Sequence, residues 1–221
     1  GLHDRQSILA TSVPADSLLR LDALAIAPFT TGLGNEHPLE NGFAFLNPYG
    51  LPYLPGSGVK GVLRQAAREL ASGDWDEKHG WSKDKDKPYS IEVDRKPIRL
   101  SMSDVLFGLE SGDGDTEHVR GALSFWDVIP QIAPEDPEDP EDPKKPDQIS
   151  LMVEIMTPHQ SHYYQQKTDN KTGGSPTPHD SGQPNPISFL TVPPGSGFTF
   201  FVTCDVAHLH RLAPALAETD P

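Results

Sequence analysis

The sequence contains only one cysteine and no long apolar run. Cys204 has no second cysteine with which to form an intrachain disulfide, and it follows an apolar run, which is typical of a buried thiol in a reducing compartment. No stretch approaches the roughly 18 apolar residues that a membrane span needs, and the N-terminus lacks the pattern of a signal peptide. The sequence therefore predicts a soluble, cytoplasmic protein without a membrane partner, and its 221 residues suffice for one large domain.

Net positive charge is also lacking, since 18 Lys and Arg residues face 32 Asp and Glu residues and the formal charge is −14. Taken as a whole, this charge argues against a free-standing nucleic-acid-binding protein, because phosphates repel acidic surfaces. The segment 134–147, PEDPEDPEDPKKPD, holds seven acids and two lysines, so −5 of the charge lies in one low-complexity loop. Its repeated prolines oppose helix and sheet formation, and we expect this acidic, proline-rich loop to be disordered.

The order of the predicted elements is strand, helix, several strands and a second helix. Residues 18–27 have the pattern of a strand, a turn rich in proline and glycine precedes a helix at about 58–71, and residues 101–109 suggest a short helical turn capped by Ser101 or Ser103. Strand signals follow at 119–129, at 150–156 and in ISFLTV and FTFFVTC, which PPGSG is expected to join into a hairpin. A helix begins near residue 205. This order predicts an α+β fold, and a ferredoxin-like arrangement fits it if one more strand follows residue 221.

The predicted helix at 58–71 carries three cations four residues apart. At about 100° per residue, Lys60, Arg64 and Arg68 form one ridge. The apolar residues lie on another face, which we expect to pack on the core: Val59, Val62, Leu63, Ala66 and Leu70. Gly56 and Gly58 allow close approach to the backbone, and the first turn offers free N–H groups at the positive end of the helix dipole. Backbone donors and Lys60 together favour a phosphate site.

Two other interpretations of this segment stay open. GSGVKG satisfies the dinucleotide pattern GxGxxG, but a dinucleotide fold also needs a strand just before the pattern and an acid that ends another strand about twenty residues later. A P-loop needs Ser or Thr after its lysine, whereas Gly61 follows Lys60. A nucleotide-dependent enzyme that uses this loop is therefore a minor alternative. The other is an ordinary amphipathic helix with solvated cations.

Five segments, in this order, resemble the RAMP superfamily of CRISPR proteins and, within it, the type III-B (Cmr) subunits: TGLGNEHPLENGFAF, NPYGLPYLPGSGVKGVLR, VRGALSFWDVIP, MTPHQSHYY and PISFLTV. The similarity extends from about residue 21 to residue 204. It implies an RRM-related, ferredoxin-like RAMP fold with inserted loops, as a single domain over residues 1–221. The C-terminal end is expected to be missing, because the glycine-rich loop typical of such proteins has no counterpart in this sequence.

The resemblance also implies a function. It indicates a structural subunit that binds guide crRNA in a hetero-oligomeric type III-B ribonucleoprotein, where it meets target RNA and other Cmr-type RAMP subunits in antiviral defence. The subunit itself is expected to be non-catalytic, since the target-cutting aspartates of such complexes belong to other subunits. Neither a cofactor nor a metal is implied.

The RNA-binding residues that we expect lie at two places. The helix-opening motif and the cations after it give six: Ser57, Gly58, Lys60, Gly61, Arg64 and Arg68. The turn at 32–37 matches another family motif and gives three more: Gly34, Asn35 and His37. Lysine supplies a point charge and arginine a fork for phosphate, while Ser57 and the backbone N–H of Gly58 supply neutral hydrogen bonds.

The main alternative function is a RAMP endoribonuclease that processes precursor guide RNA, with His37 as acid or base. His159 and Tyr163 are candidates for stacking on RNA bases, with packing in a loop as the simpler role. Three acids in apolar settings lack a partner at a spacing diagnostic of acid–base chemistry and are expected to be structural: Asp22, Asp104 and Asp127.

Overall fold

The computed structural model describes residues 1–36, 41–73, 87–93, 95–109, 118–133, 150–157 and 186–217. The chain forms two compact units, which are described separately. Unit 1 comprises Gly1–Ala23, Leu54–Ile129 and Phe198–Pro221, and unit 2 comprises Leu24–Tyr53 and Pro130–Gly197. The acidic loop at 134–147 lies outside the described residues, and the single domain over 1–221 stays a prediction.

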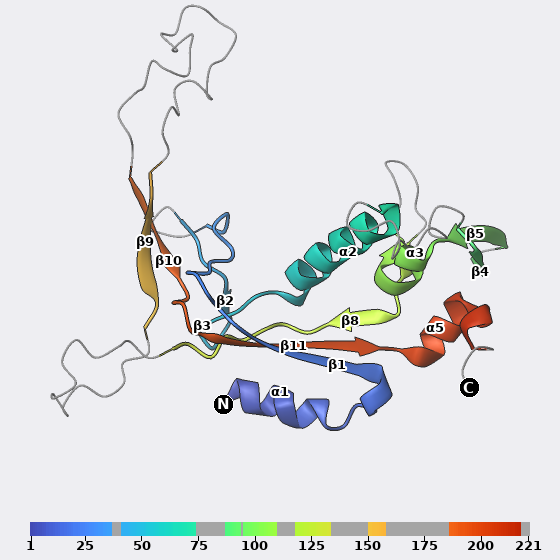
Figure 1. Ribbon diagram of the computed structural model, residues 1–221, viewed down its shortest axis with the longest axis horizontal. Coiled ribbons are helices and arrows are strands. Elements are labelled where there is room, and N and C mark those ends of the chain that lie inside the picture. Colours follow the sequence, from blue (N-terminus) through green and yellow to red (C-terminus); the bar gives the residue numbers. More distant parts are fainter. Residues whose placement is uncertain are drawn as a thin grey trace, which may run out of the picture. The chain divides into compact units, whose positions relative to one another are not determined.

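The centre of unit 1 is a three-stranded sheet in the order β1–β11–β8, whose strands lie side by side in Figure 1. These strands are β1 (Leu18–Leu24), β11 (Gly197–Cys204) and β8 (Leu123–Phe125). β11 runs antiparallel to β8, with Val202 opposite Phe125. The middle strand is apolar and β-branched, as a strand with neighbours on both sides requires, whereas β1 lies at an edge and is largely exposed. The mixture of helices and strands confirms the α+β prediction.

Aromatic and polar contacts fix helices to this sheet. α1 (Leu2–Ala10) is attached by hydrogen bonds, since the His3 Nε2 atom lies 3.2 Å from Thr199 Oγ1 and Gln6 Nε2 donates to the Asp127 carbonyl at 2.7 Å. Phe125 stacks on Phe107 of α3 (Met102–Phe107), with 5.7 Å between the ring centroids. Trp126, which follows Phe125, packs on the middle strand β11, since the ring centroids of Trp126 and Phe201 are 5.3 Å apart.

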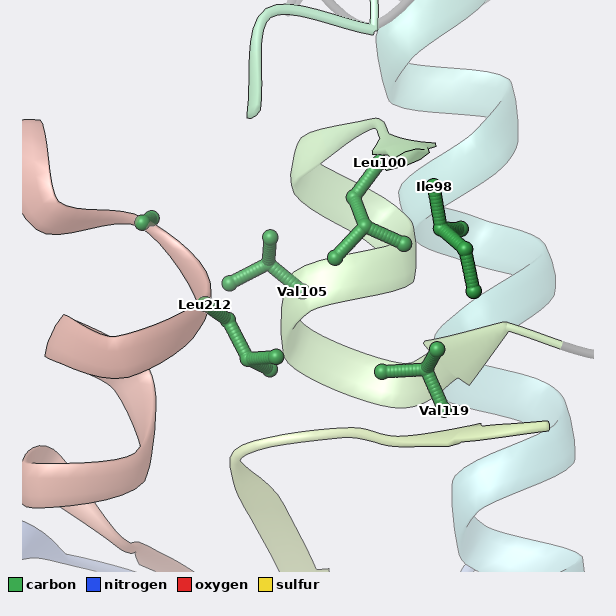
Figure 2. Packing of buried hydrophobic residues seen from close by; sticks show 6 residues of the cluster. Ile98, Leu100, Val105, Val119 and Leu212 are labelled. Atoms are coloured by element: carbon green, nitrogen blue, oxygen red, sulfur yellow. The ribbon is translucent and has the colours of Figure 1, made fainter. Parts of the chain in front are cut away.

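A hydrophobic cluster in unit 1 joins short elements that are distant in the sequence (Figure 2). β4 (Tyr89–Val93) and β5 (Lys96–Leu100) form the peripheral hairpin, β6 (Gly108–Leu109) pairs with β7 (Val119–Arg120), and α5 (Val206–Leu212) follows β11. The buried members are Ile98, Leu100, Val105, Val119, Leu212 and Ala213. The short 3-10 helices η1 (Ala15–Ser17) and η3 (Pro214–Leu216) precede β1 and follow α5.

The capping box of α3 confirms the predicted helical turn. The Asp104 N–H donates to Ser101 Oγ at 3.1 Å, and the Asp104 carboxylate accepts from the Ser101 N–H at 3.0 Å. These two hydrogen bonds satisfy backbone N–H groups at the start of the helix that have no partner within it. The role of Asp104 is therefore structural, as expected.

Unit 2 contains two short antiparallel pairs of strands. β9 (Met152–Met156) pairs with β10 (Ile187–Thr191), and β2 (Phe45–Leu46) pairs with β3 (Leu51–Pro52). Phe29 and Val192 exchange two backbone hydrogen bonds, of 3.0 and 2.7 Å, and tie the end of β10 to the segment after β1. Phe43, Ala44 and Val192 are buried.

The predicted hairpin of ISFLTV and FTFFVTC is wrong. β10 pairs with β9, whereas β11 pairs with β1 and β8. The intervening PPGSG does turn, with Gly195 at φ +80°, but its backbone bonds to Ala25: the Gly195 N–H donates to the Ala25 carbonyl at 2.7 Å and the Ser196 carbonyl accepts from the Ala25 N–H at 2.9 Å. The turn therefore sends the chain from one sheet to another.

The ferredoxin-like detail and the expected loss of the C-terminal end stay predictions. No helix among the described residues is both long and apolar enough to cross a membrane.

The cluster of Figure 2 yields a stability prediction. Leu100 has no exposed surface, so Leu100→Ala is expected to lower the free energy of unfolding by about 2–5 kcal/mol through lost burial and a residual cavity. Leu63 is 42% exposed, and the matched Leu63→Ala change should cost less than about 1 kcal/mol. Urea unfolding followed by circular dichroism measures both values. Equal losses would contradict the central place of Leu100 in this cluster.

Candidate nucleic-acid interface

α2 (Gly56–Ser72) is fixed against the end of β8 by its first residue. A Cβ atom on Gly56 would lie 2.2 Å from the Phe125 carbonyl oxygen, so only glycine fits there. The Gly56 N–H donates to Asp127 Oδ1 at 2.7 Å, and the Gly58 N–H donates to the Pro55 carbonyl at 2.8 Å. The expectation of free N–H groups in this turn is therefore wrong for Gly56 and Gly58, because a carboxylate of the chain itself already occupies the helix N-terminus.

The buried face of α2 differs from the predicted one. It consists of Gly56, Val59, Arg64, Ala67 and Ala71. Val62 and Leu63, which were expected to pack on the core, are 71% and 42% exposed. Small residues at the contact allow the helix to approach its neighbours closely, and this fit sets the rotation of the helix more strongly than the size of its apolar side chains.

Arg64 belongs to the packed face, so the expected ridge of three exposed cations is wrong. Its side chain is 9% exposed, and Nη2 donates to the Gly108 carbonyl at 3.2 Å. Gly108 has φ +95°, a conformation that favours glycine, and lies directly after α3. The guanidinium of Arg64 therefore ties α2 to the connection between α3 and β6.

The exposed face of α2 carries the other residues of the predicted set. Ser57, Gly58, Gly61 and Arg68 are exposed, and Lys60 is half-buried. A Cβ atom on Gly61 would meet no atom within 4 Å, and one on Gly58 would make only an ordinary contact of 3.5 Å with Leu54. A glycine inside a helix costs about 0.5–1 kcal/mol relative to alanine. The described fold requires neither glycine, and both leave the helix backbone open to a close partner.

The second predicted place lies in unit 2. Gly34 and Asn35 are exposed in a turn that the Asn35 N–H closes by donating to the Gly32 carbonyl at 2.9 Å. Gly32 has φ +76°, and a Cβ atom there would lie 2.7 Å from the Ala44 nitrogen, whereas Gly34 faces open space. The turn therefore needs Gly32 and not Gly34. His37, together with His159 and Tyr163, lies outside the described residues.

Cations are distributed unevenly along the chain. Unit 1 holds 14 of the 18 Lys and Arg residues and 20 of the 32 Asp and Glu residues, so its formal charge is −6, and unit 2 carries −8. Among the described residues, all 11 Lys and Arg residues lie in unit 1. An RNA contact on unit 1 must therefore rest on the local charge of one face and not on the net charge.

The remaining candidate groups are engaged in the structure. Asp22 accepts from Thr199 Oγ1 at 2.7 Å and from Arg20 at 3.1 Å, and these hydrogen bonds lower the pKa of Asp22. Asp127 caps α2 as described above, so both acids have the structural roles that we expected. Burial raises the pKa of the Cys204 thiol, and the neighbouring Asp205 adds to the effect. A thiol with a raised pKa is protonated at neutral pH.

Comparison with known proteins gives the family. Residues 23–212 match the RAMP superfamily, and the chain belongs to it. Among curated proteins, the chain is 31% identical over 185 residues to the CRISPR system Cmr subunit Cmr6 of Pyrococcus furiosus, with 73% of this chain and 50% of that protein covered. The chain thus spans about half the length of this relative.

One of two similar solved structures supports the fold. One chain of the type III-B Cmr-beta complex bound to cognate target RNA, determined by cryo-electron microscopy, is 16% identical and has a TM-score of 0.50, covering 100% of this chain and 56% of the other. The crystal structure of Cmr6 from Pyrococcus furiosus is 26% identical and covers 92% of this chain and 90% of the other, with a TM-score of 0.33. The first likeness supports the RAMP fold, and the second is too low in TM-score to add to it.

The two kinds of glycine in α2 should respond oppositely to alanine. Gly61→Ala should raise the free energy of unfolding by about 0.5–1 kcal/mol, because it removes the entropic penalty of glycine and meets open space. Gly56→Ala should lower it by about 1–3 kcal/mol, because the new methyl group collides with the Phe125 carbonyl. The urea midpoints of the two variants measure this difference. A loss of stability in Gly61→Ala would show that the fold does need this glycine.

Substitutions of the two arginines of α2 should also differ in their effect on the free energy of unfolding. Arg64→Ala removes a buried, charged hydrogen-bond donor from Gly108, and the free energy of unfolding should fall by about 1.5–3 kcal/mol. Arg68→Ala changes an exposed position and should stay within about 0.5 kcal/mol of the unsubstituted chain. Thermal unfolding of the two variants distinguishes them, and equal melting temperatures would argue against the structural role of Arg64.

Proposed function

We propose that this chain is a non-catalytic, RNA-binding subunit of a cytoplasmic type III-B CRISPR effector. In that assembly it holds guide crRNA, including crRNA paired with target RNA, beside other Cmr-type RAMP subunits. The similarity to Cmr6 supports the assembly. The observation that carries the RNA contact is the exposed face of α2, where two glycines that the described fold does not require accompany the exposed Arg68, while Lys60 on the same helix is half-buried.

The proposed contact lies along the side of α2 and not at its N-terminus. Asp127 already neutralises the first turn, so a phosphate there would meet a carboxylate. Lys60 and Arg68 are eight residues apart, about 12 Å along the helix axis, which suits two separate phosphates of one strand. Gly58 and Gly61 lie between Ser57 and Arg68 and let the sugar–phosphate backbone approach the helix.

Contacts of this kind do not read the bases. Backbone phosphates carry no sequence information, so a face built from glycine, serine and two cations suits a subunit that must accept different guide sequences. Gly34 and Asn35 of unit 2 can add neutral hydrogen bonds, but the described part of that unit supplies no cation. Arg64 is left out of the proposed contact, because it is buried and bonded to Gly108.

Two finer points belong to the same proposal. The sheet β1–β11–β8, with Phe107 of α3 stacked on β8, supports a ferredoxin-like, RRM-related core. The alternative of a nucleotide loop at GSGVKG loses support, because Gly56 is packed against Phe125 and its N–H is bonded to Asp127. No described residue favours the endoribonuclease, whose expected acid or base is His37.

The test is to co-express the chain with the neighbouring genes of its locus, to purify the complex through this chain and to sequence the RNA that it retains. Unsubstituted protein should retain short RNAs of uniform length. Lys60→Ala/Arg68→Ala should retain several-fold less RNA at high salt, because two phosphate contacts are lost. Lys96→Ala/Arg99→Ala is the matched control, since it removes the same charges from β5 in the same unit.

Three outcomes are distinguishable. Loss of RNA in the α2 variant and not in the β5 variant supports the proposal. Equal retention by all three proteins would overturn the role of α2. Absence of both RNA and partner proteins from the unsubstituted sample would overturn the proposed function itself.

A further inference from the structure

The β9–β10 pair of unit 2, labelled in Figure 1, exposes many apolar side chains. Four of the five residues of β9 are large, apolar and exposed: Met152 (37%), Val153 (65%), Ile155 (66%) and Met156 (48%). The fifth, Glu154, is half-buried. This reverses the usual preference, in which apolar residues of a strand are covered and charged residues are exposed.

Both faces of this two-stranded pair are apolar. In the antiparallel register, Val153 lies opposite Leu190, and Met156 lies opposite Ile187. Because successive residues point to opposite faces, these two pairs occupy different faces. The base of the pair is firmly held, with Thr191 and Val192 almost completely buried. A two-stranded pair with two apolar faces is only marginally stable in water. The part of this pair distant from Thr191 would therefore be stabilised by another molecule that covers its apolar side chains.

The two edges of the pair differ. On the outer side of β10, Asn41 Nδ2 donates to the Ser188 carbonyl at 3.1 Å. Ser188 lies opposite Ile155, and its carbonyl points away from β9, so the alternation of antiparallel pairing places the backbone groups of Ile155 and Val153 on the outer edge of β9. Within the described residues, β9 has no strand neighbour besides β10. Val153 and Ile155 therefore combine the most exposed side chains of β9 with an open backbone edge.

The chemistry of this surface favours a protein over RNA. The described part of unit 2 contains no Lys or Arg, and Glu154 is the only charged residue of the pair. RNA affinity depends largely on cations that displace the counterions of phosphates, and this surface has none to offer. An uncharged strand from another protein fits this surface better, because its apolar side chains can pack on those of β9 and its backbone can bond to the open edge of β9.

We propose that β9 is a docking strand for a neighbouring protein subunit. The partner adds an uncharged, apolar strand to the outer edge of β9, bonds to the backbone of Val153 and Ile155 and covers their side chains. The identity of this neighbour as a subunit of the same assembly rests on the proposed function. The docking itself is independent of any RNA contact on α2.

Hydrogen exchange of the peptide 151–157 tests this proposal without any substitution. It is measured in the isolated chain at low and high concentration, in the chain with a single-stranded RNA oligomer, and in the complex with the proteins of the same locus after ribonuclease treatment. The outward amides of Val153 and Ile155 should exchange at least about tenfold more slowly in the ribonuclease-treated complex than in the isolated chain, which corresponds to about 1.4 kcal/mol.

Three outcomes would overturn the proposal, each in its own way. Protection by the RNA oligomer alone would make β9 an RNA contact. Protection of the isolated chain that rises with concentration would make the partner a second copy of this chain. Unchanged exchange in the complex would show that no strand is added. Guide RNA is quantified in the untreated complex, so protection of β9 without any RNA would overturn the proposed RNA role and leave the docking intact.

A charge substitution provides a second, independent measurement. Val153→Lys/Ile155→Lys should reduce retention of the neighbouring proteins at least about tenfold, because it introduces two charges into an apolar contact. Val153→Ile/Ile155→Val is the matched control, which keeps the surface apolar and should retain them. An RNA contact predicts the opposite sign, since two lysines would strengthen RNA binding. Unchanged protein retention in the lysine variant would overturn the proposal.

Discussion

The contact between Gly56 and the end of β8 determines what α2 can do. The helix approaches the Phe125 carbonyl so closely that a side chain at Gly56 is excluded, and Asp127 binds the N–H of the same residue. With this point fixed, the helical period turns Arg64 inward and leaves Gly61 and Arg68 outside. The same carboxylate that stabilises the helix N-terminus also removes it as an anion site. Any phosphate contact on α2 must therefore lie on its exposed side.

Local signals in the sequence predicted α2 and α3 but missed α1 (Leu2–Ala10), and long-range packing explains two further failures. Proline before glycine at 55–56 and the Ser101 cap lie next to the helices that they start, so α2 and α3 were found. The buried face of α2 was not, because hydrophobicity favours Val62 and Leu63 as core residues, whereas close packing favours glycine and alanine. The hairpin at PPGSG failed because a turn signal does not say which strand the chain pairs with next.

The RNA-binding site stays a prediction, and the structure changes which residues of α2 can belong to it. The spacing of four residues predicted that Lys60, Arg64 and Arg68 form one ridge of the helix. The burial of Arg64 depends instead on the carbonyl of Gly108, which lies 44 residues further along the chain. Nothing in the helix itself signals that bond. Likewise, the net charge of −14 averages over segments of very different composition, such as the acidic loop at 134–147, and so does not give the charge of any one surface.

Two features of this chain lower its stability, and no contact within the described residues compensates for them. Gly58 and Gly61 weaken a helix in which alanine would fit, and β9 exposes apolar side chains that water disfavours. Under the two proposals, both features become favourable when another molecule binds, RNA at α2 and a protein strand at β9. Because all described cations lie in unit 1 and none in the described part of unit 2, the two proposed contacts use different chemistry on different units. In this proposal one unit binds RNA without reading its sequence, and the other joins the protein assembly.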